Sequence, residues 1–139
     1  MKRKIESIYL HCSATTDGTV EAIRKYHIEH NGWTDIGYHF IIYRDGSIHK
    51  GREEDAVGAH VKGDNSHSLG ICLIGIDQFT DAQMKSCLDL VTQLSAKYKV
   101  KTLNIRGHKE FWIDQGLPAK KNCPGFDVSL LRTKIDSLA

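Results

Sequence analysis

The sequence has no long apolar run and no run of charges of one sign. Its longest apolar stretches cover residues 71–76 and 40–43, whereas a helix needs about 20 apolar residues to cross a bilayer. Lysine and arginine together number 19 and aspartate and glutamate 17, a net charge of +2 that no segment concentrates. We therefore expect no membrane insertion and no nucleic-acid binding driven by bulk electrostatics.

Cysteine is also scarce. Four cysteines among 139 residues are too few for disulfide bonds to be the main source of stability. The apolar stretch that follows Glu6 is too short for a signal peptide, which predicts synthesis in the cytoplasm without an export signal. With 40% hydrophobic and 26% charged residues, the composition is that of an ordinary globular protein. The length favours a single domain over residues 1–139, which we expect to be a monomer.

Hydrophobic periodicity predicts strands that alternate with helices. Asp45 and Gly46 form a strong turn signal and predict a hairpin, and the almost wholly apolar residues 69–76 predict a central strand covered on both faces. This pattern favours an α/β fold (α+β in some schemes) of three layers, with helices on both faces of a mixed central sheet. Further strands are expected over residues 7–11, 38–44, 47–50 and 102–106, and helices over residues 20–31, 80–99 and 128–138, with caps at Thr19, Thr80 and Asp127.

Histidine is the one residue type in excess, with eight copies, and it indicates metal or proton chemistry. His11 and His108 come at the ends of predicted strands, and Cys123 lies in a loop bounded by glycine and proline. The three residues are too far apart in the sequence to form a local metal-binding motif. Two neutral imidazoles and one thiolate nevertheless suit zinc, and three protein ligands leave a fourth position for water, as in a catalytic site. Taken alone, Cys123 also fits a buried thiol.

Four segments, in order along the chain, resemble a single family. They read GWTDIGYHFIIYRDG (residues 32–46), VGAHVKGDN (57–65), SLGICLIG (68–75) and KKNCPGF (120–126). Together they resemble the zinc N-acetylmuramoyl-L-alanine amidases, above all the amidase lysozymes of T-odd coliphages, and the related peptidoglycan recognition proteins of animals. The resemblance covers about residues 9–126. It implies the three-layer fold and cleavage of the amide between the lactyl group of N-acetylmuramic acid and L-alanine, with peptidoglycan or muropeptides as substrate.

At the positions that match the family's motifs, the resemblance also implies roles for single residues. It implies one zinc ion (Zn²⁺) per monomer, held by His11, His108 and Cys123. It further implies catalytic roles for Tyr38 and Lys121. Family members that only bind peptidoglycan typically lack the cysteine ligand, which is retained here.

These residue types suit hydrolysis of an amide, whose carbonyl is a poor electrophile. Bound zinc would polarise the carbonyl and lower the pKa of a coordinated water to about 7. We expect the Tyr38 hydroxyl to orient or deprotonate that water and the Lys121 ammonium to stabilise the oxyanion. Glu110 is a poorer base, because it would have to fold back onto the site from its place two residues after His108. Taken singly, Tyr38 also fits a core aromatic and Lys121 a surface charge.

The family uses the region around His60 and Asn65 to line the groove that holds the glycan and the stem peptide. We therefore expect these two residues to contact substrate. Trp33 is expected at an edge of the groove, and a buried packing role is the alternative for it. We assign Cys12 no function.

The other histidines are expected to be structural or exposed. His39 follows Tyr38 on a predicted strand, so its side chain should point to the opposite face. His27 and His30 are interpreted as surface or rim residues of a helix, and His49 as a surface residue of the hairpin.

Three functions are compatible with the resemblance. The first is a lytic enzyme that cuts polymeric peptidoglycan, as a prophage endolysin would. The second is a cytosolic amidase that trims soluble muropeptides in wall recycling. The third is a non-catalytic binder or regulator, since phage members of the family also bind and inhibit their phage RNA polymerase. The intact set of zinc ligands with Tyr38 and Lys121 argues against pure binding, and the phage-like segment at residues 32–40 favours the lytic enzyme.

Overall fold

The computed structural model describes residues 3–110 and 124–138. Two residues singled out by the sequence, Lys121 and Cys123, therefore lie outside the described part of the chain. The elements follow one another as β1 (Ser7–Cys12), α1 (Val20–Asn31), β2 (Phe40–Ile42), β3 (Ile48–Lys50), η1 (Asn65–His67), β4 (Ser68–Leu73), α2 (Asp81–Tyr98), η2 (Thr102–Asn104), β5 (Ile105–Gly107) and α4 (Val128–Leu138).

Within the described ranges the strands form one five-stranded sheet in the order β3-β2-β4-β1-β5. β1 runs parallel to β4 and to β5, and β2 runs parallel to β4. β3 is antiparallel to β2, with Ile41 opposite His49, so the hairpin predicted at Asp45 and Gly46 is confirmed. All six residues of β4 are buried, and the expectation of an apolar central strand is confirmed as well.

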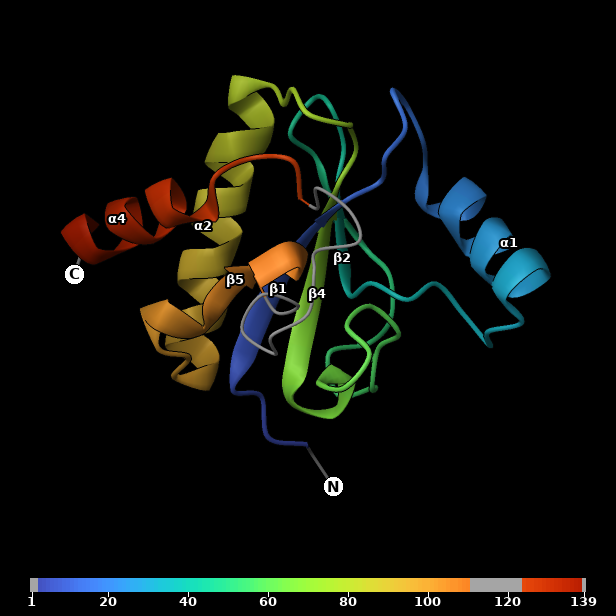
Figure 1. The fold of residues 1–139 in the computed structure, drawn as a ribbon, viewed down its shortest axis with the longest axis horizontal. Helices are drawn as coiled ribbons and strands as arrows, with labels where there is room; N and C mark the ends of the chain where they lie inside the picture. Colours follow the sequence, from blue (N-terminus) through green and yellow to red (C-terminus); the bar gives the residue numbers. More distant parts are fainter. Residues whose placement is uncertain (1–2, 111–123, 139) are drawn as a thin grey trace.

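The helices cover both faces of this sheet, as the three-layer prediction requires. α1 lies on one side of the strands, while α2 and α4 lie on the other (Figure 1). No helix in residues 3–110 or 124–138 is long and apolar enough to cross a membrane.

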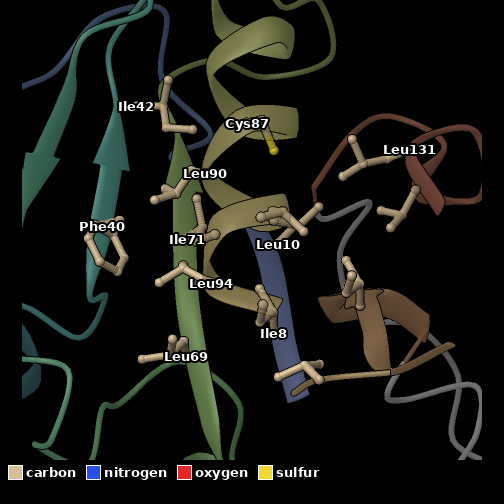
Figure 2. Close-up of a cluster of buried hydrophobic side chains, with 14 of the residues drawn as sticks. Ile8, Leu10, Phe40, Ile42, Leu69, Ile71, Cys87, Leu90, Leu94 and Leu131 are labelled. Atoms are coloured by element: carbon tan, nitrogen blue, oxygen red, sulfur yellow. The ribbon is translucent and has the colours of Figure 1, made fainter. Parts of the chain in front are cut away.

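The larger apolar core lies between the sheet and the α2–α4 layer. Alternate residues of β1 and β4, such as Leu10 and Ile71, point toward α2, where Leu90 and Leu94 meet them (Figure 2). A smaller cluster under α1 contains Val20, Ile41, Cys72 and Ile74 among others. Because strand side chains alternate between faces, the residues of β1 between those that face α2 are turned toward the α1 side of the sheet.

Each helix begins where the sequence places a capping residue. The side chain of Thr19 accepts a hydrogen bond from the Ala22 amide at the start of α1, and the left-handed Gly32 (φ 70°) ends that helix. Thr80, the predicted cap, forms a capping box with Gln83 at the start of α2. The Asp127 carboxylate accepts a hydrogen bond from the Ser129 amide at the start of α4.

One predicted strand forms over only part of its expected range. Residues 102–106 were expected to be extended, but residues 102–104 form the short helical turn η2, and only residues 105–107 pair with β1. The turn satisfies its own backbone, because the Asn104 amide donates to the Lys101 carbonyl at 2.9 Å.

Candidate active site

A cavity of about 970 Å³ opens on the α1 side of the sheet, at the end where β1 finishes. Its walls come from β1, the loop between β1 and α1, α1, the segment before β2, the loop before η1, the segment after β4 and the residue after β5. Five of the residues predicted to form the site line it together, and they are His11, Trp33, Tyr38, His60 and His108.

The two predicted histidine ligands are brought together by strand pairing. β1 and β5 are parallel, and Leu10 lies opposite Gly107, so the residues that follow, His11 and His108, emerge at the same edge of the sheet. Their ring centroids are 4.8 Å apart. His11 is only 2% exposed, so its ring is enclosed by the protein at the cavity wall.

Tyr38 enters the cavity from the segment just before β2. Its ring is half-buried, and its centroid lies 5.1 Å from that of His11 and 5.6 Å from that of His27. The ring of Tyr38 therefore lies beside one of the two paired histidines.

His60 is packed directly against His11. Its Nδ1 atom lies 3.0 Å from Nε2 of His11, and its Nε2 atom lies 3.3 Å from the hydroxyl of Ser68. The side chain is 8% exposed, and burial lowers the pKa of the ring well below its usual range. His60 is therefore a neutral imidazole that lines the cavity and contacts a predicted ligand.

Asn65 lies behind the cavity wall. It begins η1, and its side-chain oxygen accepts hydrogen bonds from the amides of His60 and Val61 at 2.9 and 2.8 Å. The residue is half-buried and is not part of the cavity lining. Its side chain thus holds the loop that carries His60.

The expectation that His27 is a surface or rim residue is wrong. The ring is 8% exposed and lines the cavity, and Trp33 packs on it with a centroid distance of 4.6 Å. Its Nδ1 atom accepts a hydrogen bond from the Gly37 amide at 2.9 Å, and burial lowers the pKa of the ring. The signal was present in the sequence, because His27 lies on the same helical stripe as the apolar residues Val20 and Ile23.

The other histidines are structural or exposed, as expected, but His39 does not point to the opposite face from Tyr38, because its ring meets that of the cavity-lining His60 at a centroid distance of 5.7 Å. His39 is fully buried and structural, because its Nδ1 atom accepts from the Gly70 amide and its Nε2 atom lies 2.8 Å from the Ala56 carbonyl. His30 is exposed and stacks on Tyr26. His49 is half-buried on the hairpin, where it stacks on Tyr43.

Glu110 is turned away from the cavity, in line with its exclusion as a base. Its two carboxylate oxygens accept hydrogen bonds from Arg132 of α4 at 3.0 and 2.9 Å, and one also accepts from the Gly107 amide. Burial acts to raise the pKa of this carboxyl, but the bonds from Arg132 and Gly107 lower it overall. Glu110 is therefore an ionised partner of α4 rather than a free base.

The chemistry of the cavity partly fits a zinc ion. His11 and His108 offer two imidazoles at one edge of the sheet, and imidazole is a common zinc ligand. Among the described residues no group of three metal-binding side chains occurs. A third ligand from Cys123 would come from outside those residues, as would the ammonium of Lys121.

A second cavity, of about 610 Å³, lies between α2 and α4 on the other side of the sheet. Apolar side chains such as Phe79, Met84 and Phe126 line it, and none of the described site residues reaches it. It is therefore separate from the predicted chemistry.

Comparison with known proteins agrees with this geometry. A model of the family described as N-acetylmuramoyl-L-alanine amidase matches residues 1–126. The endolysin of Escherichia phage T7 is 44% identical over 138 residues, covering 91% of this chain and 85% of its own length. The endolysin of Enterobacteria phage T3 is 46% identical over 134 residues, covering 88% and 82%.

A solved structure shows the same fold. The N-acetylmuramoyl-L-alanine amidase LysC from Clostridium intestinale URNW superposes with a TM-score of 0.85 at 31% identity, covering 96% of this chain and 87% of that one. His11, Tyr38, His60 and His108 all lie within the range that the family model matches. By sequence and by fold, this chain belongs to the N-acetylmuramoyl-L-alanine amidase family.

Proposed function

We propose that this chain is a lytic enzyme of the bacterial cell wall, which hydrolyses the amide between the lactyl group of N-acetylmuramic acid and L-alanine in peptidoglycan. The observation that carries the proposal is the cavity in which His11, His108 and Tyr38 meet, in a chain that belongs to the amidase family. The similarity to phage endolysins supports a polymeric wall as the substrate.

We further propose that the enzyme holds one zinc ion with His11, His108 and Cys123. The close approach of the two histidine rings supports two of these ligands. When bound, the ion would supply Lewis acidity, which polarises the amide carbonyl and makes a water molecule a stronger nucleophile.

Tyr38 and Lys121 carry out the remaining steps. The Tyr38 hydroxyl orients the attacking water and takes part in moving its proton, because the phenol lies beside His11 at the cavity wall. The Lys121 ammonium stabilises the negative charge that develops on the carbonyl oxygen as the amide becomes tetrahedral.

Trp33 and His60 form the walls that the glycan or the stem peptide would meet. Both line the cavity, and the half-buried indole of Trp33 offers a flat apolar surface to a sugar or a peptide. Asn65 contributes to binding through the loop that it holds in place.

The test compares two substrates with the purified chain. Dye-labelled sacculi should be solubilised, and the Tyr38→Phe variant, which keeps the ring, should solubilise them far more slowly. Release of peptide from a soluble muropeptide without any solubilisation of sacculi would contradict the lytic assignment and indicate an enzyme of wall recycling. Binding to sacculi with no cleavage of either substrate would contradict an enzymatic function.

A further inference from the structure

The imidazole of His60 lies in a slot formed by two glycines. A Cβ atom at Gly70 would lie 2.6 Å from Cγ of His60, and one at Gly58 would lie 2.8 Å from its Cδ2. Contacts this short do not occur in folded proteins, so any side chain larger than hydrogen at either position would displace the ring. The ring also meets those of His11 and His39 edge to face, with centroids 5.1 and 5.7 Å apart.

The backbone that carries His60 is fixed on both sides. Asn65 accepts hydrogen bonds from the amides of His60 and Val61. The Tyr9 hydroxyl donates to the Asp64 carboxylate at 2.8 Å, and Arg3 donates to the Ser68 carbonyl at 2.8 Å. These bonds tie the loop to β1, to the segment before it and to the start of β4. The position of the ring is therefore set by the fold before any ligand arrives.

The hydrogen bonds of Ser68 decide which nitrogen of His60 carries the hydrogen. The Ser68 hydroxyl has one hydrogen, and its 2.7 Å bond to the Asp64 carbonyl uses it. At 3.3 Å from Nε2 of His60, the same oxygen must then accept. Nε2 of His60 therefore carries the hydrogen, and Nδ1 presents a lone pair.

That lone pair determines which ring nitrogen of His11 carries the hydrogen. Nδ1 of His60 lies 3.0 Å from Nε2 of His11, and a nitrogen that accepts there requires the hydrogen on Nε2 of His11. The nitrogen of His11 that carries a lone pair is then Nδ1, and only such a nitrogen binds a metal ion.

We propose that His60 is a positioning residue, which acts on His11 by fixing the orientation of its ring and placing the lone pair on Nδ1 for the metal. This inference rests on the proposed zinc function of His11. The site then includes a fixed chain of hydrogen bonds, which runs from His11 through His60 and Ser68 to the Asp64 carbonyl.

The first test measures the position of the hydrogens without metal or substrate. In the full chain, stripped of metal and labelled with ¹⁵N on histidine, long-range ¹H–¹⁵N correlation spectra distinguish the two neutral forms of each ring. We expect the hydrogen on Nε2 in both His11 and His60, with signals assigned by His11→Asn and His60→Asn variants. A His11 ring with its hydrogen on Nδ1 would overturn the proposal.

The second test measures zinc affinity by competition with a chromophoric chelator. His60→Phe keeps a ring in the slot but removes the acceptor, and we expect it to weaken zinc binding by about 10- to 100-fold, the usual effect of losing a partner of a metal ligand. His60→Asn places an amide oxygen close to the position of Nδ1 and should restore most of that loss. His30→Phe, at an exposed histidine that is not part of the cavity lining, should leave the affinity unchanged.

The variants separate positioning from general damage to the fold. If His60→Phe bound zinc as tightly as the unchanged chain, or if His60→Asn were as weak as His60→Phe while both melted as cooperatively as the unchanged chain, the proposal would be wrong. A chain with the expected hydrogens and zinc affinities that cleaved no peptidoglycan would refute the proposed function and leave this inference standing.

Discussion

At Tyr38, the packing of the ring can be separated from the chemistry of the hydroxyl by a single substitution. Its ring packs between His11 and His27, and Phe at this position would keep that packing while losing the hydroxyl. We expect Tyr38→Phe to keep the fold and the zinc content but to lower kcat by about 10²- to 10⁴-fold, the range for one acid–base group. KM should change much less, since the group acts mainly in the transition state. Steady-state kinetics with metal analysis tests this, and normal turnover would reassign Tyr38 to packing.

Lys121 and Lys120 are neighbours with different expected roles. Lys121 is two residues before the predicted ligand Cys123, a spacing that would keep its backbone close to the metal. We expect Lys121→Ala to lower kcat by about 10²- to 10³-fold, as for the loss of one oxyanion donor, with zinc content and binding to sacculi nearly intact. The matched variant Lys120→Ala should have a much smaller effect. A larger loss in Lys120→Ala would show that the register assigned to this segment is wrong by one residue.

Cys123 is the predicted ligand with the softest donor atom. A serine hydroxyl is a far weaker zinc ligand than a thiolate, so Cys123→Ser should lose tightly bound metal, and chelators should abolish the activity of the unchanged chain. Metal analysis after dialysis gives the answer. Full zinc occupancy in Cys123→Ser would remove Cys123 from the ligand set.

Gln83 ties the start of α2 to the sheet. Its side chain is fully buried, donates to the carbonyls of Ile42 and Ile74, and accepts from the Thr80 amide. Gln83→Ala leaves these three groups without that partner, so we expect a loss of about 1–3 kcal/mol in the free energy of unfolding. The exposed Gln93 on the same helix provides the control, and Gln93→Ala should cost far less in chemical denaturation. Equal losses in the two variants would show that the buried bonds contribute little.

Elements set by local signals were predictable, whereas those that depend on distant partners were less so. The caps at Thr19 and Thr80 and the turn at Gly46 act within a few residues, and all three occur as expected. Thr102 has a strand-favouring side chain, but only residues 105–107 have a partner in β1. Pairing, which is a tertiary property, thus overrode local propensity there.

Buried histidines should make the free energy of unfolding of the whole domain depend on pH. Burial lowers the pKa of His39 from the ordinary 6.5 to about 4, so the unfolded chain binds a proton more readily than the folded one between these values. The free energy of unfolding should therefore fall as pH decreases from 6.5 to 4, by up to about 1.4 kcal/mol per pH unit from this residue.

Chemical denaturation of the metal-free chain between pH 4 and 6.5 measures how steeply the free energy of unfolding changes with pH. His39→Gln should reduce the slope even if it lowers stability at every pH, while His30→Gln, at an exposed histidine, should not. An unchanged slope in His39→Gln would place the titration elsewhere.

The assembly of the site illustrates what a single sequence reveals and what it does not. Motif resemblance identified His11, Tyr38 and His108, and the strand pairing that joins two of them follows from a parallel sheet. The hydrogen bond between His11 and His60 depends on a loop that packs across the sheet. Such packing has no local signature, so His60 was expected only to contact substrate. His27 was misplaced at the surface although the helical stripe that it shares with Val20 and Ile23 indicated its burial.

The proposed enzyme cuts one specific bond of peptidoglycan. The direct test is chemical analysis of purified sacculi after digestion, with new amino termini identified by labelling and the fragments weighed by mass spectrometry. The proposed activity predicts new L-alanine amino termini, with intact glycan strands that carry a free lactyl carboxylate and no new reducing ends. New reducing ends, or new amino termini from any residue other than that L-alanine, would contradict it.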